Sequence, residues 1–293
     1  LRQLRRGGIY VRTTKRELAL PPMRIIPVEL EMSDLQSHVY SALRRSYAGQ
    51  LEMSESEQAY FARRGRAAMT LLAAATNPGV MLSSTHEDAY LGVLWPPAEL
   101  TGSETLMTVL QSFVRHDLPP KYEWVVRFVD EAARHGRKVL IWSTLVGNLL
   151  SLERVLGPYG TALVYGSVSS DERQTEIAKF RSSAECTVLL TNPQTLGEGI
   201  SLHKECHDAI FIDRSYNAGL YLQALDRIHR LGLPDDQETN IYLLQSAGTI
   251  DERVSRRLTQ KIERLASYMD DAGLVEVSLP SADGEDLPET VLG

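Results

Sequence analysis

KVLIWSTLVGNLLSLERVLGPYGTALVYG, residues 138–166, is the stretch that decides the fold class of this chain. Its first apolar run, KVLIWS, has the length and composition of a buried strand. The amphipathic segment NLLSLERVLG follows, and Gly157 closes it as glycine commonly closes a helix. A second apolar run, TALVYG, has the composition of another strand. The order strand, helix, strand predicts a parallel sheet.

The same alternation continues toward the C-terminus. The further strands that we predict are CTVLLT, DAIFID and TNIYLLQ, and the further helices are SSDERQTEIAKFR and TIDERVSRRLTQKIERLASYM. Five strands interleaved with helices predict an α/β fold, a parallel sheet covered by helices on both faces. Ligands of such sheets lie beyond the carboxyl ends of the strands. The segments to examine are therefore 143–144, 166–167, 191–199 and 213–217.

The part of the chain before this alternation has a different pattern. In DLQSHVYSALRRSY, four apolar side chains recur at four-residue spacing, which predicts a helix. A second helical segment ends at the Asn77-Pro78-Gly79 breaker. We expect four parts, namely a basic extended linker at 1–33, a mainly helical appended region at 34–120, an α/β lobe at 121–269 and an acidic tail at 270–293.

Composition excludes several classes of protein. The chain has 293 residues with 43% hydrophobic and 24% charged residues, which are ordinary globular values. No apolar run approaches the roughly 18 residues that span a bilayer, and no signal peptide is visible. The first residue is Leu1, so we expect a piece of a longer protein. His203, Cys206 and His207 in LHKECHD suggest zinc, but the spacing is short and a fourth ligand is missing, so we expect no metal site.

Charge is distributed unevenly along the chain. The net charge is −7, yet the segment from Asp270 onward holds seven acids and no Lys or Arg, so the rest is neutral. The first 24 residues hold seven basic side chains against the single acid Glu17. This polarity permits a surface that faces phosphates without requiring one.

The segment YLQALDRIHRLG, residues 221–232, concentrates polar groups on one side of a predicted helix. At about 100° per residue, Gln223, Arg227 and Arg230 fall within roughly 60° of each other. Two guanidinium groups on one face can bind a carboxylate or reach a phosphate. The structural alternative is that Asp226 pairs with Arg230 and that the helix dipole favours both arginines near the C-terminus.

Two loops at strand ends have phosphate-binding features with equally simple alternatives. In LLTNPQTLGEGISL, Gly197 and Gly199 allow the backbone to approach a phosphate, although such a loop can also merely turn a corner. In YGSVSSDERQ, a helix begins near Ser169, where an anion can bind or where the serine is a routine cap.

In this order the segments resemble the second RecA-like lobe of superfamily-two helicases, most closely the Swi/Snf-type ATPases that translocate on DNA. KVLIWST, Gly166-Ser167 with Glu172-Arg173, LGEGISL and QALDRIHRLG match the family's motifs, and residues 10–43 look like its linker into the lobe. The resemblance covers about residues 9–267. It implies a RecA-like parallel sheet at 121–269. Glu198 replaces a loop glycine, and DRSYNAG stands where the family has an Asp…Trp-Asn-Pro turn.

The resemblance implies that this chain is one half of a motor. A helicase-type ATPase needs a Gly-Lys-Ser/Thr loop, and the chain contains no Gly-Lys pair. VVRFVDEAARH imitates an Asp-Glu box, but its apolar residues follow a helical period, so we reject it as catalytic. ATP and Mg²⁺ are then held mainly by a first lobe that this chain lacks, and the chain alone is expected to be inactive.

The resemblance also implies roles for individual residues. Arg227 and Arg230 are the expected arginine fingers, and Gln223, Gly197 and Gly199 are expected to contact or couple to the nucleotide. The residues expected to meet the DNA backbone are Ser143, Thr144, Gly166, Ser167, Arg173 and Thr191.

We therefore expect the second lobe of an ATP-dependent DNA translocase or remodeller. The expected partners are the backbone of duplex DNA, the N-terminal ATP-binding lobe of the same protein and a partner protein, with no membrane. We expect a cytoplasmic protein, or a nuclear one if the source is eukaryotic. The alternatives are a non-catalytic protein-docking module on the same scaffold and an RNA helicase lobe.

Overall fold

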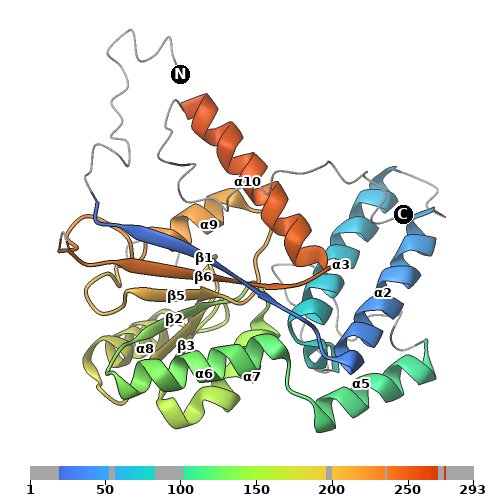
Figure 1. The fold of residues 1–293 in the computed structure, drawn as a ribbon, viewed down its shortest axis with the longest axis horizontal. Helices are drawn as coiled ribbons and strands as arrows, with labels where there is room; N and C mark the ends of the chain where they lie inside the picture. The colour runs from blue at the N-terminus through green and yellow to red at the C-terminus, as the bar shows by residue number, and fades with distance from the viewer. Residues whose placement is uncertain are drawn as a thin grey trace.

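The computed structural model describes residues 20–52, 57–82, 100, 102–195, 200–234, 236–269 and 274. Its centre is a sheet of six strands in the order β1-β6-β5-β2-β4-β3, and every neighbouring pair is parallel (Figure 1). The strands are β1 (Met23–Leu30), β2 (Val139–Trp142), β3 (Thr161–Val164), β4 (Val188–Thr191), β5 (Asp208–Phe211) and β6 (Thr239–Ser246). The α/β fold that the sequence predicts is confirmed.

Helices cover both faces of this sheet, as predicted. One face packs against α6 and α7 through a cluster that includes Val125, Leu152 and Ile141. The other face packs against α8, α9 and α10, with Phe180, Tyr221 and other side chains in the larger cluster. The helices are α2 (Asp34–Glu52), α3 (Glu57–Thr76), α5 (Glu104–His116), α6 (Pro120–Arg134), α7 (Val146–Leu156), α8 (Ser170–Ser182), α9 (Ala218–Leu225) and α10 (Ile250–Met269), with the short 3₁₀ helices η2 (Pro78–Leu82) and η3 (Gly157–Tyr159).

Strand β1 was not expected, because its segment was interpreted as a basic extended linker. It adds to the edge of the sheet beside β6, in register from Met23 with Thr239 to Leu30 with Ser246. An edge position tolerates Pro27, which has no N–H to donate to a second neighbour. The linker segment therefore contributes a strand to the sheet of the lobe.

The appended helices pack beside the sheet and share its core (Figure 1). The last turn of α3 is fully buried, and its carbonyl groups are satisfied by neighbouring elements. Gln36 Nε2 donates to the carbonyl oxygens of Ala74 and Ala75 at 3.0 Å each, and Ser246 Oγ donates to that of Ala75 at 2.7 Å. Because unsatisfied carbonyls are costly in a core, these bonds fix the end of α3 against the lobe. We propose a lobe boundary near residue 120, where α6 begins after α5.

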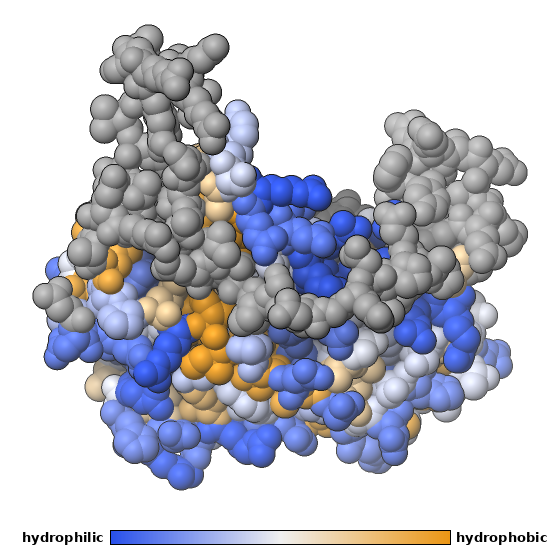
Figure 2. Space-filling view, turned by 45° about the horizontal axis from the view of Figure 1, so that its top comes forward, coloured by the Kyte–Doolittle hydropathy of each residue, from blue (hydrophilic) through white to orange (hydrophobic). Residues whose placement is uncertain are grey.

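The surface combines hydrophilic and apolar areas. Figure 2 shows apolar side chains gathered near the middle of one face, with hydrophilic side chains around them. Among the described residues, Leu231 and Tyr268 are the most exposed large hydrophobic side chains, at 58% and 70%. No helix in the described ranges is both long and apolar enough to cross a membrane.

Candidate functional site

The carboxyl ends of the central strands meet at one edge of the sheet. The backbone N–H of Ser143, just after β2, donates to Thr191 O at the end of β4, at 3.1 Å. Ile212, just after β5, donates to Trp142 O at 3.0 Å. The loops after β2, β4 and β5 therefore leave the sheet side by side, where ligands of parallel sheets bind.

The buried carboxylate of Asp213 connects the segments at this edge of the sheet by hydrogen bonds. Its carboxylate accepts hydrogen bonds from Ser143 Oγ, from the backbone N–H of Thr144 at 2.6 Å and from Asn148 Nδ2 at 3.1 Å. Burial raises the pKa of Asp213, while the hydrogen bonds from Ser143 and Thr144 and the charge of Lys121 act in the opposite direction. The sequence placed Asp213 at a strand end but gave it no role. The signal was an acid that closes an apolar run.

Three of the residues expected to meet a phosphate backbone have buried side chains. Ser143, Thr144 and Thr191 are exposed by 0%, 4% and 0%. Ser143 Oγ also accepts a hydrogen bond from the N–H of Leu145 at 3.1 Å, so the hydroxyl shapes the turn after β2. These side chains therefore pack beneath the loops at the carboxyl ends of the strands and do not face solvent.

The loop after β3 contains residues that are accessible to solvent. Ser167 is exposed and Gly166 is partly exposed. Arg173, on the first turns of α8, donates to the carbonyl oxygens of Thr195 and Val168 at 3.4 Å each. Its guanidinium group therefore joins the loop after β3 to the loop after β4.

The start of α8 is a routine cap. Ser169 Oγ accepts from the N–H of Glu172, and the Glu172 carboxylate accepts from the N–H of Ser169, which is a complete capping box. These bonds lower the pKa of Glu172. A carboxylate already occupies the helix start, so the alternative of an anion site there is not favoured.

Several buried polar atoms gather just before the glycine-rich loop. Arg173 Nε, Asn192 Oδ1, Gln194 Oε1 and Thr195 Oγ1 have no hydrogen-bond partner in the described structure. Native proteins rarely leave such atoms unsatisfied, and those that remain are often found where something else binds. Residues 196–199, which include Gly197 and Gly199, lie outside the described residues.

The arginine-bearing segment differs from the sequence prediction in its local form. Helix α9 ends at Leu225, and the chain continues in tight turns. Arg227 N donates to Ala224 O at 3.2 Å, and His229 N donates to Leu225 O at 3.0 Å. The expectation of a helix through residue 232 is therefore wrong, because α9 ends at Leu225. Of Gln223, Arg227 and Arg230, only Gln223 lies in the helix.

Arg227 and Arg230 nevertheless reach the same segment. Arg227 Nη1 donates to Ile200 O at 3.4 Å, and Arg230 Nη1 donates to Ser201 Oγ. The N–H of Leu202 in turn donates to Arg227 O at 2.8 Å. The two arginines are thus tied to the residues that directly follow the glycine-rich loop.

The two guanidinium groups differ in exposure. Arg230 is exposed and Arg227 is half-buried. Burial lowers the pKa of Arg227, Asp226 raises it, and the neighbouring charge of Arg230 lowers it again. A partly desolvated cation beside a second cation favours an anionic ligand.

Residues 120–232, which hold all of this geometry, match the helicase conserved C-terminal domain family. The lobe is thus similar to helicase C-terminal domains. It is similar to the "Chromatin-remodeling ATPase INO80" of Neurospora crassa, with 30% identity over 135 residues, covering 45% of this chain and 7% of the relative. The same protein of Aspergillus oryzae is 32% identical over 141 residues, covering 46% of this chain and 10% of the relative. The chain thus spans a tenth or less of the length of these relatives.

Solved structures share the fold over most of this chain. The C-terminal part of the Fun30 ATPase domain superposes with a TM-score of 0.60 at 19% identity, covering 82% of this chain and 90% of that one. The Sulfolobus solfataricus SWI2/SNF2 ATPase core in complex with dsDNA gives 0.55 at 21% identity, covering 94% and 54%. The RecA-like fold that the resemblance implies is confirmed.

The turn after the two arginines contains a glycine with a positive φ. Gly232 has φ +104°, a conformation that L side chains rarely adopt. A Cβ there would lie 3.1 Å from His203 Nε2. The glycine behind the arginines therefore lets the chain turn close over His203.

The zinc-like segment of the lobe is accounted for by packing. Cys206 Sγ is buried and donates to Asp208 O at 3.1 Å and to Lys138 O at 3.3 Å. Burial raises the pKa of Cys206 to about 12, so the thiol stays neutral. Within the described ranges, no three His, Cys, Asp or Glu side chains are grouped so as to hold a metal ion.

Proposed function

We propose that this chain supplies the second lobe of an ATP-dependent motor that translocates on DNA or remodels DNA-bound assemblies. One observation carries the proposal. Arg227 and Arg230 leave the end of α9 together and contact Ile200 and Ser201, the two residues that directly follow the glycine-rich loop. The relatives described as chromatin-remodeling ATPases support it. In a eukaryotic source such a protein would be nuclear, and otherwise cytoplasmic.

The two arginines would act as fingers on a nucleotide held mainly by a first lobe. ATP with Mg²⁺ supplies the phosphoryl group and its charge. Arg227 and Arg230 would neutralise the negative charge that spreads over the transferred phosphoryl oxygens, an effect worth about 10³ to 10⁵ in rate. The partial burial of Arg227 fits this role, because an anionic partner relieves the cost of its desolvation.

Three further residues would contact the nucleotide or couple it to DNA. Gln223 is exposed on the last turns of α9, from where it would contact the nucleotide. Gly197 and Gly199 would couple the nucleotide to DNA through the loop that both arginines hold at its far end.

The DNA side would lie along the loops after β2, β3 and β4. Gly166, Ser167 and Arg173 would face the phosphate backbone, and a translocase needs such contacts because they carry no base identity. Ser143, Thr144 and Thr191 would act through the position of their backbone, since their side chains are buried. A related SWI2/SNF2 core has been solved with dsDNA.

The test measures ATP turnover in the full-length protein. Arg227→Ala and Arg230→Ala should each lower turnover about a hundredfold or more, with only a modest loss of ATP binding. Arg181→Ala is the matched control, because Arg181 Nη2 donates to Ser201 O at 2.7 Å and thus contacts the same segment from α8. Equal losses in all three variants would assign a structural role and overturn the finger proposal.

A second experiment compares the 293-residue chain with the full-length protein, and it also separates the motor from a docking module and from an RNA helicase lobe. The 293-residue chain alone should hydrolyse ATP negligibly, and rates equal to those of the full-length protein would refute this. A docking module predicts no turnover in either protein. An RNA helicase lobe predicts preference for single-stranded RNA over duplex DNA, in salt-dependent binding.

A further inference from the structure

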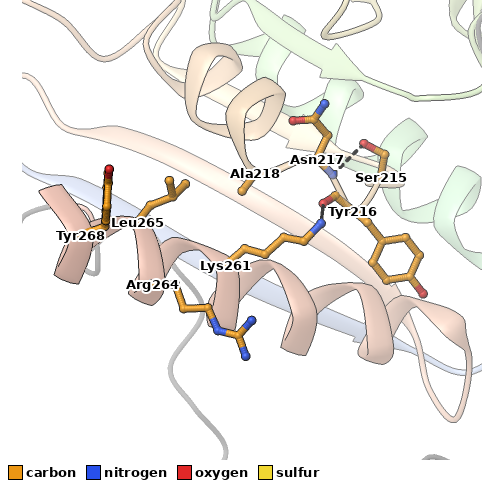
Figure 3. Close-up of a pocket in the computed structure, with 8 residues that line it drawn as sticks. All are labelled: Ser215, Tyr216, Asn217, Ala218, Lys261, Arg264, Leu265 and Tyr268. Carbon is orange, nitrogen blue, oxygen red and sulfur yellow. Dashed lines mark hydrogen bonds between the residues drawn. The ribbon is translucent and has the colours of Figure 1, made fainter. Parts of the chain in front are cut away.

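A groove that neither Arg227 nor Arg230 lines lies between α10 and the loop that precedes α9. Its volume is about 820 Å³. It is lined by Ser215, Tyr216, Asn217, Ala218, Lys261, Arg264, Leu265 and Tyr268 (Figure 3). Figure 3 shows Lys261 reaching from α10 to the loop, where its Nζ donates to Tyr216 O at 2.5 Å. Leu265 and Ala218 supply an apolar floor beside this contact.

The groove has a cationic wall. Lys261, Arg264 and Tyr268 line the groove, and Arg257, one turn before Lys261, continues the same side of α10. All four are exposed, and Tyr268 is exposed by 70%. A stripe that offers three cations and an open aromatic ring suits an acidic ligand with some apolar side chains.

Further charged side chains act on Tyr216, which lines the groove. Burial raises the pKa of Tyr216, the charges of Arg253, Arg64 and Arg257 lower it, and the charge of Asp251 raises it. Cations from both α3 and α10 therefore act on the same tyrosine.

The sequence contains a segment with the complementary chemistry. Residues 275–293 contain acids and no Lys or Arg, and apolar residues are interspersed among the acids. The acids are Glu276, Asp283, Glu285, Asp286 and Glu289, and the apolar partners include Leu279, Leu287 and Val291.

The segment also has enough length to reach the groove. Leu274, which precedes it, is buried against the core only five positions after α10 ends at Met269. The nine residues that follow Leu274, up to Asp283, extend up to about 30 Å, while the cationic stripe from Arg257 to Tyr268 is roughly 17 Å long.

We propose that the acidic segment 275–293 docks in this groove of the same chain. Its carboxylates would meet Lys261 and Arg264, and its leucine and valine side chains would cover Leu265 and the ring of Tyr268. Occupied in this way, the groove is closed to other polyanions, and the chain's strongest acidic run is neutralised internally. The proposal does not depend on ATP hydrolysis.

Zero-length carbodiimide cross-linking of the whole chain tests the proposal directly. The reagent joins a lysine amine to a carboxylate in contact with it, with loss of water, and peptide mass spectrometry identifies the pair. Lys261 should be joined to acids within 283–289, independently of protein concentration and less so at high salt. Exposed Lys179 and Lys204 serve as internal comparisons. Links mainly to those lysines, or only between two chains, would overturn the proposal.

A matched pair of variants separates docking from chance proximity. Lys261→Arg keeps the charge and removes the amine, so the link at this position should vanish while hydrogen exchange of residues 215–218 stays slow. Replacing Asp283, Glu285, Asp286 and Glu289 by their amides should speed that exchange severalfold without changing the exchange of β2 and β4. Unchanged exchange in the amide variant contradicts docking. Protection of the groove only when duplex DNA is added would assign the groove to DNA and overturn the proposal.

Discussion

The ammonium group of Lys121 lies 2.7 Å from the carboxylate of Asp251, and the two side chains are exposed by only 1% and 4%. Lys121 Nζ also donates to Ile212 O at 2.8 Å and to Thr76 Oγ1 at 3.3 Å. The same Asp251 oxygen accepts the N–H of Ser246 at 2.8 Å. One fully bonded ion pair therefore joins the end of α3 to the starts of α6 and α10.

Lys121→Met should lower the free energy of unfolding by about 3–5 kcal/mol, because it leaves the Asp251 carboxylate buried without its cation. Denaturant unfolding monitored by circular dichroism measures the change. The matched control is Arg134→Met, which breaks the pair with Asp130 where the arginine is 73% exposed. An exposed pair is worth about 1 kcal/mol at most. Similar losses in both variants would contradict the role given to the buried pair.

Gly232→Ala should lower the free energy of unfolding by about 1–3 kcal/mol, because alanine is strained at φ +104° and its Cβ presses on His203. Gly157→Ala is the control. Gly157 has no positive φ, and no atom lies within 4 Å of its added Cβ. Thermal unfolding of both variants makes the comparison, and an unaffected Gly232→Ala variant would show that the turn after Arg230 is adaptable.

The imidazole of His203 reports where the Arg230 guanidinium lies. Burial lowers the pKa of His203 from 6.5, and the charges of Arg230 and then Lys204 lower it further, while Glu205 raises it. Arg230→Gln should therefore raise the pKa toward its usual value, and Lys204→Gln should raise it less. Titration by NMR of the imidazole protons gives both values. No change in the Arg230→Gln variant would place that guanidinium away from His203.

The lowered pKa of His203 determines whether the free energy of unfolding rises or falls with pH near 6.5. Because the pKa of His203 is lower in the folded state, the unfolded chain binds more protons just below pH 6.5. The stabilising contribution is fully present above that pH and is lost as pH falls toward the folded pKa. Replacing His203 by Gln should remove this part of the pH dependence, which denaturant unfolding at several pH values measures.

Local pattern was sufficient for most of the fold. The apolar runs that predicted β2 to β6 are confirmed, and so is the helical period that argued against a catalytic box in VVRFVDEAARH, now α6. Strand β1 was missed because it is an edge strand whose side chains alternate between exposed and half-buried, so its apolar signal is weak. It pairs with β6, which is far away in the sequence.

The candidate site was harder to predict from the sequence for the same reason as β1, because its contacts join residues that are far apart along the chain. The spacing of Arg227 and Arg230 placed them together, but the spacing did not show that α9 ends at Leu225. Residues 226–229 continue with hydrogen bonds three and four residues back, so a helical period persists where the helix has ended. The contacts with Ile200 and Ser201, like the bond of Ser143 to Asp213, join loops that only the sheet brings together.

The loops joined by Arg173 give the sharpest test of the DNA surface. If Arg173 contacts one phosphate, Arg173→Gln should weaken binding of duplex DNA by the whole chain at every sequence, and the slope of log K against log salt should fall by about 1. Fluorescence anisotropy across a salt series measures both. Arg154→Gln is the control, because Arg154 is an exposed arginine on α7, which covers the opposite face of the sheet. A lower affinity with an unchanged slope would mean that Arg173 only holds the carbonyl oxygens of Val168 and Thr195, and that the loops it joins, rather than its charge, meet the DNA.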